Sequence, residues 1–123
     1  MQPFMKSNFK LKLNANELDA IRFTKNIFQI QSTSTTSNQD FDLIKRLIYT
    51  QMIEVYQKID RLSLQFDFAK LGLIQKDYVS LNLNYGQAIG LYLFLTNYPI
   101  KEDDTYLYNI IQMMISEINL YLN

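Results

Sequence analysis

Hydrophobic and polar residues alternate in two short segments, one near the start of the chain and one in its second half. Residues 9–13 read Phe-Lys-Leu-Lys-Leu, and residues 79–83 read Val-Ser-Leu-Asn-Leu. Strict alternation is typical of a strand that buries one face. Each segment is followed by an asparagine, Asn14 or Asn84, and then by a glutamate or glutamine three residues later. This spacing favours a helix that begins with a capping box. The sequence therefore predicts a strand followed directly by a helix at both places.

The pattern changes to a helical period after each strand. Apolar residues spaced by three or four positions predict a helix over residues 18–30 and another that ends before Pro99, because proline cannot continue a helix. A longer amphipathic helix follows in each half, one beginning near Gln39 and one near Glu102. The apolar stripe of the first long helix comprises Phe41, Ile44, Ile48, Met52, Val55, Ile59 and Leu62, and that of the second comprises Leu107, Ile111, Met114, Ile118 and Tyr121.

The two halves correspond in sequence at two different offsets. The strands and first helices match at a longer offset, which pairs Leu11 with Leu81, and the second helices match at a shorter one, which pairs Leu47 with Ile110. The polar tract at residues 31–37 lies between them in the first half, and its length equals the difference between the two offsets. A single insertion therefore reconciles them. This agreement indicates an internal duplication of one strand–helix–helix unit.

We therefore predict one domain, residues 1–123, with repeats at about 9–60 and 79–123 and a connector at about 61–78. The predicted fold class is α+β with helix dominant. It is a four-helix bundle with two short strands, which can pair antiparallel about a pseudo-twofold axis. Residues 63–78 are ambiguous, because they fit either an extra strand or the frayed end of the long helix.

Composition removes several kinds of chemistry. The chain has no cysteine and no histidine, which excludes disulfides, thiol nucleophiles, structural zinc sites and imidazole catalysis. Its 12 basic and 12 acidic residues give zero formal net charge, whereas non-specific binders of nucleic acid usually carry a positive excess. We therefore expect no enzymatic activity, no cofactor and no metal.

Two stretches of the sequence bear on location. Residues 1–6 do not resemble a secretory signal, and the apolar run at 88–95 is too short to span a membrane. We expect a cytoplasmic protein that does not enter the membrane. The abundance of Asn, Ile and Lys is typical of AT-rich bacterial or phage genomes.

Two pairs of residues at helical spacings invite functional interpretations, but structural roles explain them better. Glu54 and Glu117 occupy equivalent positions in the two halves, yet Glu54 lies four residues before Lys58, a spacing that favours a surface ion pair. Gly86 and Gly90 lie four residues apart on one predicted helix and indicate that another helix packs closely against that face.

The halves differ most on their first helices. The outward positions of the first copy are the charged residues Asp19, Arg22 and Lys25, and the matching positions of the second copy are Ile89, Tyr92 and Leu95. The helix at about 85–98 is thus apolar nearly all round and needs cover on every side. Either residues 63–78 of the same chain or a second subunit could supply that cover.

Three functional hypotheses follow from these features. The first is a non-enzymatic protein-interaction domain, with a protein partner or a second copy bound through Ile89, Tyr92 and Leu95. The second is a weak nucleic-acid-binding accessory protein, and its candidate contacts are Lys10, Lys12, Arg22 and Lys25. The third is a small-molecule-binding domain with a tyrosine-lined pocket between the two copies.

Overall fold

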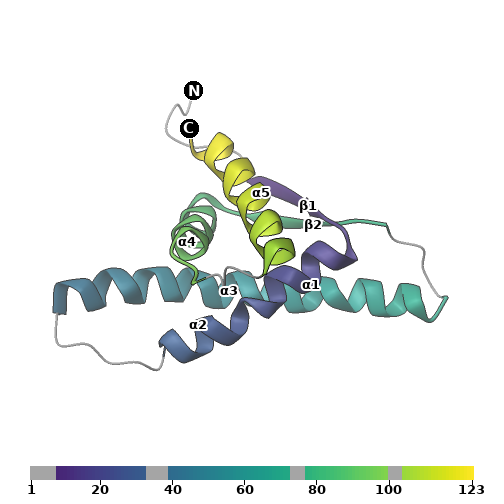
Figure 1. The fold of residues 1–123 in the computed structure, drawn as a ribbon, viewed down its shortest axis with the longest axis horizontal. Coiled ribbons are helices and arrows are strands. Elements are labelled where there is room, and N and C mark those ends of the chain that lie inside the picture. The colour runs from purple at the N-terminus through teal and green to yellow at the C-terminus, as the bar shows by residue number, and fades with distance from the viewer. Residues whose placement is uncertain (1–7, 33–38, 73–76, 100–103) are drawn as a thin grey trace.

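The computed structural model describes residues 8–32, 39–72, 77–99 and 104–123. In these residues helix dominates, and two strands complete the fold (Figure 1). The elements are β1 (Phe9–Leu13), α1 (Ala15–Phe23), α2 (Lys25–Ser32), α3 (Gln39–Lys70), β2 (Val79–Leu83), α4 (Tyr85–Thr96) and α5 (Thr105–Leu122). None of the described helices has the length and apolar character needed to cross a membrane.

The two predicted strands pair with each other. β1 and β2 are antiparallel, and their register places Leu11 opposite Leu81 at the centre of the pair. The inward leucines Leu11, Leu13, Leu81 and Leu83 are fully buried. Two strands alone are marginally stable in water, so the pair depends on the helices that cover its apolar face. Those helices cross between the halves, since α3 contacts β2 and α5 contacts β1.

Both predicted capping boxes are present. Asn14 and Asn84 each accept a hydrogen bond from the backbone N–H three residues later, and the side chains of Glu17 and Gln87 accept in return from the asparagine N–H groups. α5 begins in a simpler way, with Asp104 accepting from the Leu107 N–H at 3.1 Å. Local sequence therefore fixes the beginnings of these three helices.

The predicted helix over residues 18–30 is interrupted at Thr24, where α1 ends and α2 begins. The Thr24 side chain is fully buried. Its hydroxyl donates to the Ile21 carbonyl and lies 2.6 Å from the Tyr56 hydroxyl of α3. Because the Thr24 proton is already used, Tyr56 is the donor in that contact. Burial raises the pKa of Tyr56, so its hydroxyl keeps this proton at neutral pH. The break is thus tied directly to α3.

Removing either hydroxyl should lower the free energy of unfolding, and the two losses should not add. Thr24→Val leaves the buried Tyr56 hydroxyl without an acceptor and should cost about 1–3 kcal/mol. Tyr56→Phe leaves Thr24 bonded to Ile21 and should cost about 1 kcal/mol. In urea denaturation, the double variant should lose about 1 kcal/mol less free energy of unfolding than the two single losses added together. Strictly additive losses would contradict the hydrogen bond.

α4 is covered by other helices of the same chain. It packs against α3 and α5, so these two helices supply the cover that its apolar surface requires. Of residues 63–78, the segment expected as one alternative for this cover, residues 63–70 continue α3, Phe66 is buried and Leu71 is exposed. Phe68 and Leu73 lie outside the residues whose side chains the structure describes.

α3 and α4 approach each other closely at Gly90, and the glycine spacing predicted such close packing of another helix. A Cβ atom at Gly90 would lie 2.7 Å from the Gln51 Cβ, a distance that real Cβ atoms do not tolerate. At Gly86 the nearest atoms of Gln51 would be 3.5 Å away, which is ordinary contact. Gly90 therefore allows the two helix backbones to approach, whereas Gly86 leaves room for a methyl group.

Alanine at these two glycines should change stability in opposite directions. Gly90→Ala forces α3 and α4 apart and should lower the free energy of unfolding by about 1–3 kcal/mol. Gly86→Ala should raise it by about 0.5–1 kcal/mol, because alanine favours a helix and meets no clash. Chemical denaturation of both variants measures the difference, and equal effects of the two substitutions would disprove the close approach.

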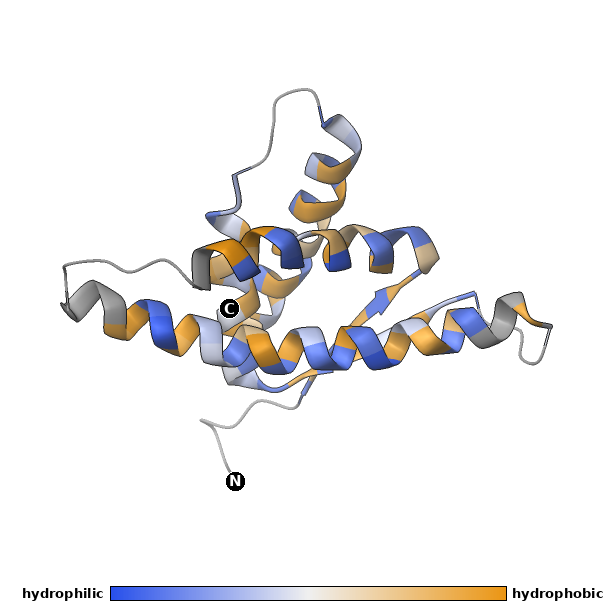
Figure 2. Ribbon diagram, turned by 90° about the horizontal axis from the view of Figure 1, so that it is seen from below, coloured by the Kyte–Doolittle hydropathy of each residue, from blue (hydrophilic) through white to orange (hydrophobic). Residues whose placement is uncertain are grey.

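α3 is longer than the body that it covers. It runs along the whole molecule, and both of its ends extend past the other helices (Figures 1 and 2). The middle of its predicted stripe is buried at Met52, Val55 and Ile59, but Ile44 is 59% exposed. Phe41 lies outside the residues whose side chains are described. The apolar stripe therefore continues onto a part of α3 that the other described residues leave exposed.

Candidate interaction groove between α3 and α4

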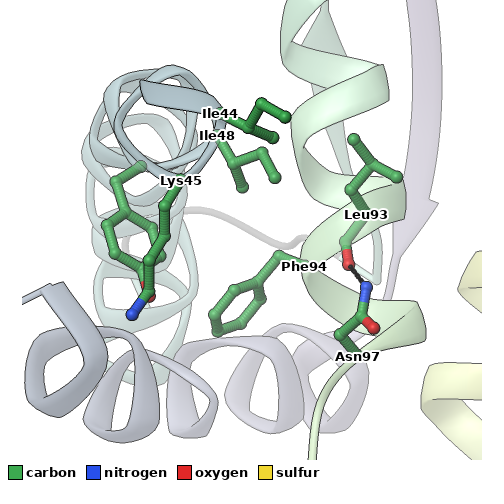
Figure 3. A pocket seen from close by; sticks show the side chains of 7 residues that line it. Ile44, Lys45, Ile48, Leu93, Phe94 and Asn97 are labelled. Atoms are coloured by element: carbon green, nitrogen blue, oxygen red, sulfur yellow. Dashed lines mark hydrogen bonds between the residues drawn. The ribbon is translucent and has the colours of Figure 1, made fainter. Parts of the chain in front are cut away.

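A groove of about 510 Å³ lies between the N-terminal half of α3 and the end of α4 (Figure 3). α3 contributes Ile44, Lys45, Ile48 and Tyr49, and α4 contributes Leu93 and Phe94, with Asn97 directly after it. The volume lies in the range of typical ligand sites, and the lining is mostly apolar. The groove lies between the two halves, as the small-molecule hypothesis expected, but Tyr49 is the one tyrosine among its described lining residues.

An aromatic cluster supports the groove from inside the protein. The Phe94 ring lies 6.0 Å from Phe28 and 6.4 Å from Tyr56, and Phe28 lies 5.3 Å from Tyr49, each pair in an edge-on arrangement. Such edge-to-face pairs add to the stability gained from burial. The far end of the groove is held by Asn97, whose Nδ2 donates to the Leu93 carbonyl at 2.8 Å (Figure 3). The walls are therefore held by packing and hydrogen bonds within the chain.

Apolar side chains of α3 extend the groove onto the protein surface. Leu43, Ile44 and Leu47 are 57%, 59% and 69% exposed, and we call these three residues the α3 patch. Leu43 and Leu47 are one helical turn apart, as are Ile44 and Ile48, so the patch forms a ridge beside the groove wall. Contiguous exposed apolar side chains on a monomer usually mark an interaction site.

The groove carries positive charge. Lys45 is one of its lining residues, with Nζ 5.7 Å from the centre of the Tyr49 ring, and the neighbouring Arg46 is exposed. None of the described residues that line the groove is acidic. Burial raises the pKa of Tyr49, so its hydroxyl is neutral at physiological pH. The described lining is thus mostly apolar, and Lys45 is its one charged residue.

The predicted interaction residues of the helix at 85–98 do not form one surface. Leu95 is 1% exposed and belongs to the core of the chain, so it is not available to a partner. Ile89 and Tyr92 are half-buried. The residues of α4 that line the groove are Leu93 and Phe94, and neither was selected when the two halves of the sequence were compared. Their place in the groove depends on where α3 lies, and no local pattern indicates that.

The four residues predicted to contact nucleic acid lie at two different places: two are beside a carboxylate of α3, and two are on β1. Arg22 Nε and Lys25 Nζ lie 3.5 Å and 2.9 Å from the Asp60 carboxylate of α3. Lys10 and Lys12 are exposed on β1, and Lys12 Nζ lies 4.6 Å from the centre of the Tyr78 ring. The structure therefore places two of these four cations on one acidic side chain of the same protein.

Glu54 and Lys58 meet through a third residue. The Gln87 Nε2 donates to Glu54 at 2.9 Å, and Lys58 Nζ donates to Gln87 Oε1 and to the Asn82 carbonyl, both at 2.7 Å. The expected direct ion pair is replaced by this network, which ties α3 to the beginning of α4. Among the described residues, no group of three or more acidic side chains is placed to hold a metal ion.

Comparisons with known proteins add no assignment to the groove. No family model matches the chain, and no curated protein or solved structure matches it significantly. The function therefore has to be inferred from the groove, the α3 patch and the charges around them.

Proposed function

We propose that this protein is a non-enzymatic protein-interaction domain that self-associates through the α3–α4 groove and the α3 patch. The observation that carries the proposal is the exposure of Leu43, Ile44 and Leu47, which lie together beside an apolar groove. This revises the surface expected from sequence, because the buried Leu95 cannot take part. We take a second copy of the chain as the partner, because it is always available to the protein.

We also propose that the two halves descend from one strand–helix–helix unit. The longer sequence offset maps Leu11 onto Leu81, and these two residues face each other at the centre of the strand pair. An antiparallel pair has its local twofold axis at such a central position. The crossed contacts of α3 with β2 and of α5 with β1 fit the same symmetry. So do the two capping boxes.

The proposed duplication gives a reason to expect a partner on the α3 patch. The shorter offset maps Ile44 and Leu47 onto Leu107 and Ile110 of α5. Leu107 and Ile110 are 6% and 8% exposed, whereas Ile44 and Leu47 are more than half exposed. The same positions are thus covered by the chain in one half and left uncovered in the other. A second copy bound there would bury the side chains that this chain leaves in water.

The expected association is weak. Burying one large aliphatic side chain contributes about 1.5–3 kcal/mol, and three such side chains make up the α3 patch. Immobilising two proteins against each other costs at least about 4 kcal/mol, which offsets much of this gain. The upper end of these figures leaves a net gain of about 4–5 kcal/mol, so we expect dissociation constants of about 0.2–1 mM, rather than an obligate oligomer.

Replacing one residue of the α3 patch should weaken self-association. Leu47→Glu places a charge at the proposed contact and should weaken association at least about tenfold in sedimentation velocity. Leu120→Glu is the matched control, because Leu120 is 79% exposed on α5 and lies outside the groove. Both variants should keep the wild-type circular dichroism spectrum, since both side chains are in water.

Two results would contradict this proposal. A wild-type protein that stays monomeric at millimolar concentration would exclude self-association. Equal effects of Leu47→Glu and Leu120→Glu would show that association does not use the α3 patch.

A further inference from the structure

One side of α3 is exposed along the N-terminal half of the helix. Its residues follow one another at spacings of three and four, which places them on a single helix face. This outer face of α3 consists of the exposed residues Leu43, Arg46, Leu47, Thr50, Ile53 and Glu54. Met52 and Val55, on the opposite side of the helix, are fully buried. In the view of Figure 2, α3 lies along the near side of the molecule. The outer face is therefore part of the protein surface.

The outer face is self-complementary about Thr50. Three positions before and after Thr50 are Leu47 and Ile53, which are both apolar and exposed. Four positions before and after it are Arg46 and Glu54, which carry opposite charges. A second copy of the helix that runs antiparallel and is centred on Thr50 reverses this order. Leu47 of each copy then lies opposite Ile53 of the other, and Arg46 of each copy lies opposite Glu54 of the other.

Both charges of the outer face are available to a second copy. Arg46 forms no ion pair with any residue that the structure describes. Glu54 accepts a hydrogen bond from Gln87 Nε2 at 2.9 Å, but this amide is neutral and a carboxylate can accept several hydrogen bonds. Lys45 lines the groove and takes no part, since residues two positions apart, such as Lys45 and Leu47, do not share a helix face. Complementary charges select which surfaces meet and fix their register.

We propose that two copies of the chain associate through the outer face of α3, antiparallel and about a twofold axis beside Thr50. The small side chain of Thr50 lies at the axis, and contacts of Leu47 with Ile53 lie on both sides of it. Two ion pairs between Arg46 and Glu54 fix the register. This inference rests on the proposed function, because it specifies the direction and the register in which a second copy covers Leu43 and Leu47 of the α3 patch.

A twofold contact has two consequences in solution. Each copy uses the same surface, so the pair leaves no second outer face free and assembly stops at the dimer. The ion pairs lie at the protein surface, where salt screens them, so association should weaken as ionic strength rises. Sedimentation velocity at increasing protein and salt concentrations measures both effects.

Single cysteines test the position of the axis. The chain has no cysteine, so a disulfide formed by one introduced cysteine must join two copies. Thr50→Cys places both thiols beside the axis. Gln57→Cys is the matched control, because Gln57 is exposed on the same side of α3 two turns further on. Its two thiols would lie about 21 Å apart, since each is seven residues from the axis at about 1.5 Å per residue. A disulfide needs Cβ atoms about 3.5–4.5 Å apart, so Thr50→Cys should form the covalent dimer at least about tenfold faster in non-reducing electrophoresis.

Charge reversal tests the two ion pairs. Arg46→Glu and Glu54→Arg should each weaken association at least about tenfold in sedimentation velocity, because each brings like charges together. The double variant with both changes restores opposite charges at both places and should regain most of the wild-type association. The two single variants mixed in equal amounts should form a 1:1 dimer for the same reason. Glu117→Lys, an exposed charge change on α5, should behave like the wild-type protein.

The outcomes separate this inference from the proposed function. A wild-type protein that is monomeric at every concentration removes both. A wild-type protein that associates, but whose two cysteine variants cross-link at equal rates, overturns the twofold contact and leaves self-association standing. So does a folded double charge variant that stays as weak as the single variants. Glu54→Arg also removes the acceptor of Gln87 Nε2. If that change unfolds the chain in circular dichroism, the cysteine variants decide, because they leave this hydrogen bond intact.

Discussion

The pairing of β1 with β2 is the constraint on which the rest of the structure depends. It joins segments that are far apart in the sequence and centres them on Leu11 and Leu81. A two-stranded sheet is marginal by itself, so the helices that bury its leucines and the sheet that positions the helices depend on each other. α3 reaches β2 and α5 reaches β1, which means that neither half covers its own strand alone. This crossing turns two strand–helix–helix segments into one core.

The groove is a consequence of how α3 and α4 meet. Their backbones approach closely at Gly90, beside Gln51, and α3 then continues toward its N-terminus beyond the other helices (Figure 1). An amphipathic helix that extends beyond the elements packed against it must leave part of its apolar stripe in water. Ile44 and Leu47 are that part. Leu107 and Ile110 of the shorter α5, which the shorter sequence offset aligns with them, are buried, so the two halves differ in helix length and cover.

Local sequence predicted the parts of the fold that local interactions decide. The strand alternation, the capping boxes at Asn14 and Asn84 and the stripe of α5 all require only near neighbours. The break at Thr24 escaped prediction because its hydroxyl is bonded to Tyr56, which lies far along the chain on α3. Leu95 was misplaced for a similar reason, since it is buried in a core to which distant helices contribute, and α4 packs against α3 and α5. The groove depends on the place where α3 extends past the other helices, and sequence periodicity does not indicate that place.

The most direct test of this account is the register of the strand pair, because this pairing joins the two halves at the centre of the core. The chain has no cysteine, so two introduced cysteines have no native thiol to react with. Lys10→Cys with Asn82→Cys places thiols on directly opposed positions, whereas Lys12→Cys with Asn82→Cys offsets them by two positions. Opposed Cβ atoms lie about 4.5–5.5 Å apart and diagonal ones about 7–8 Å, and a disulfide needs about 3.5–4.5 Å. The account predicts that the opposed pair oxidises much faster to an intramolecular disulfide, as read by mass spectrometry. Equal or faster cross-linking of the offset pair would contradict it.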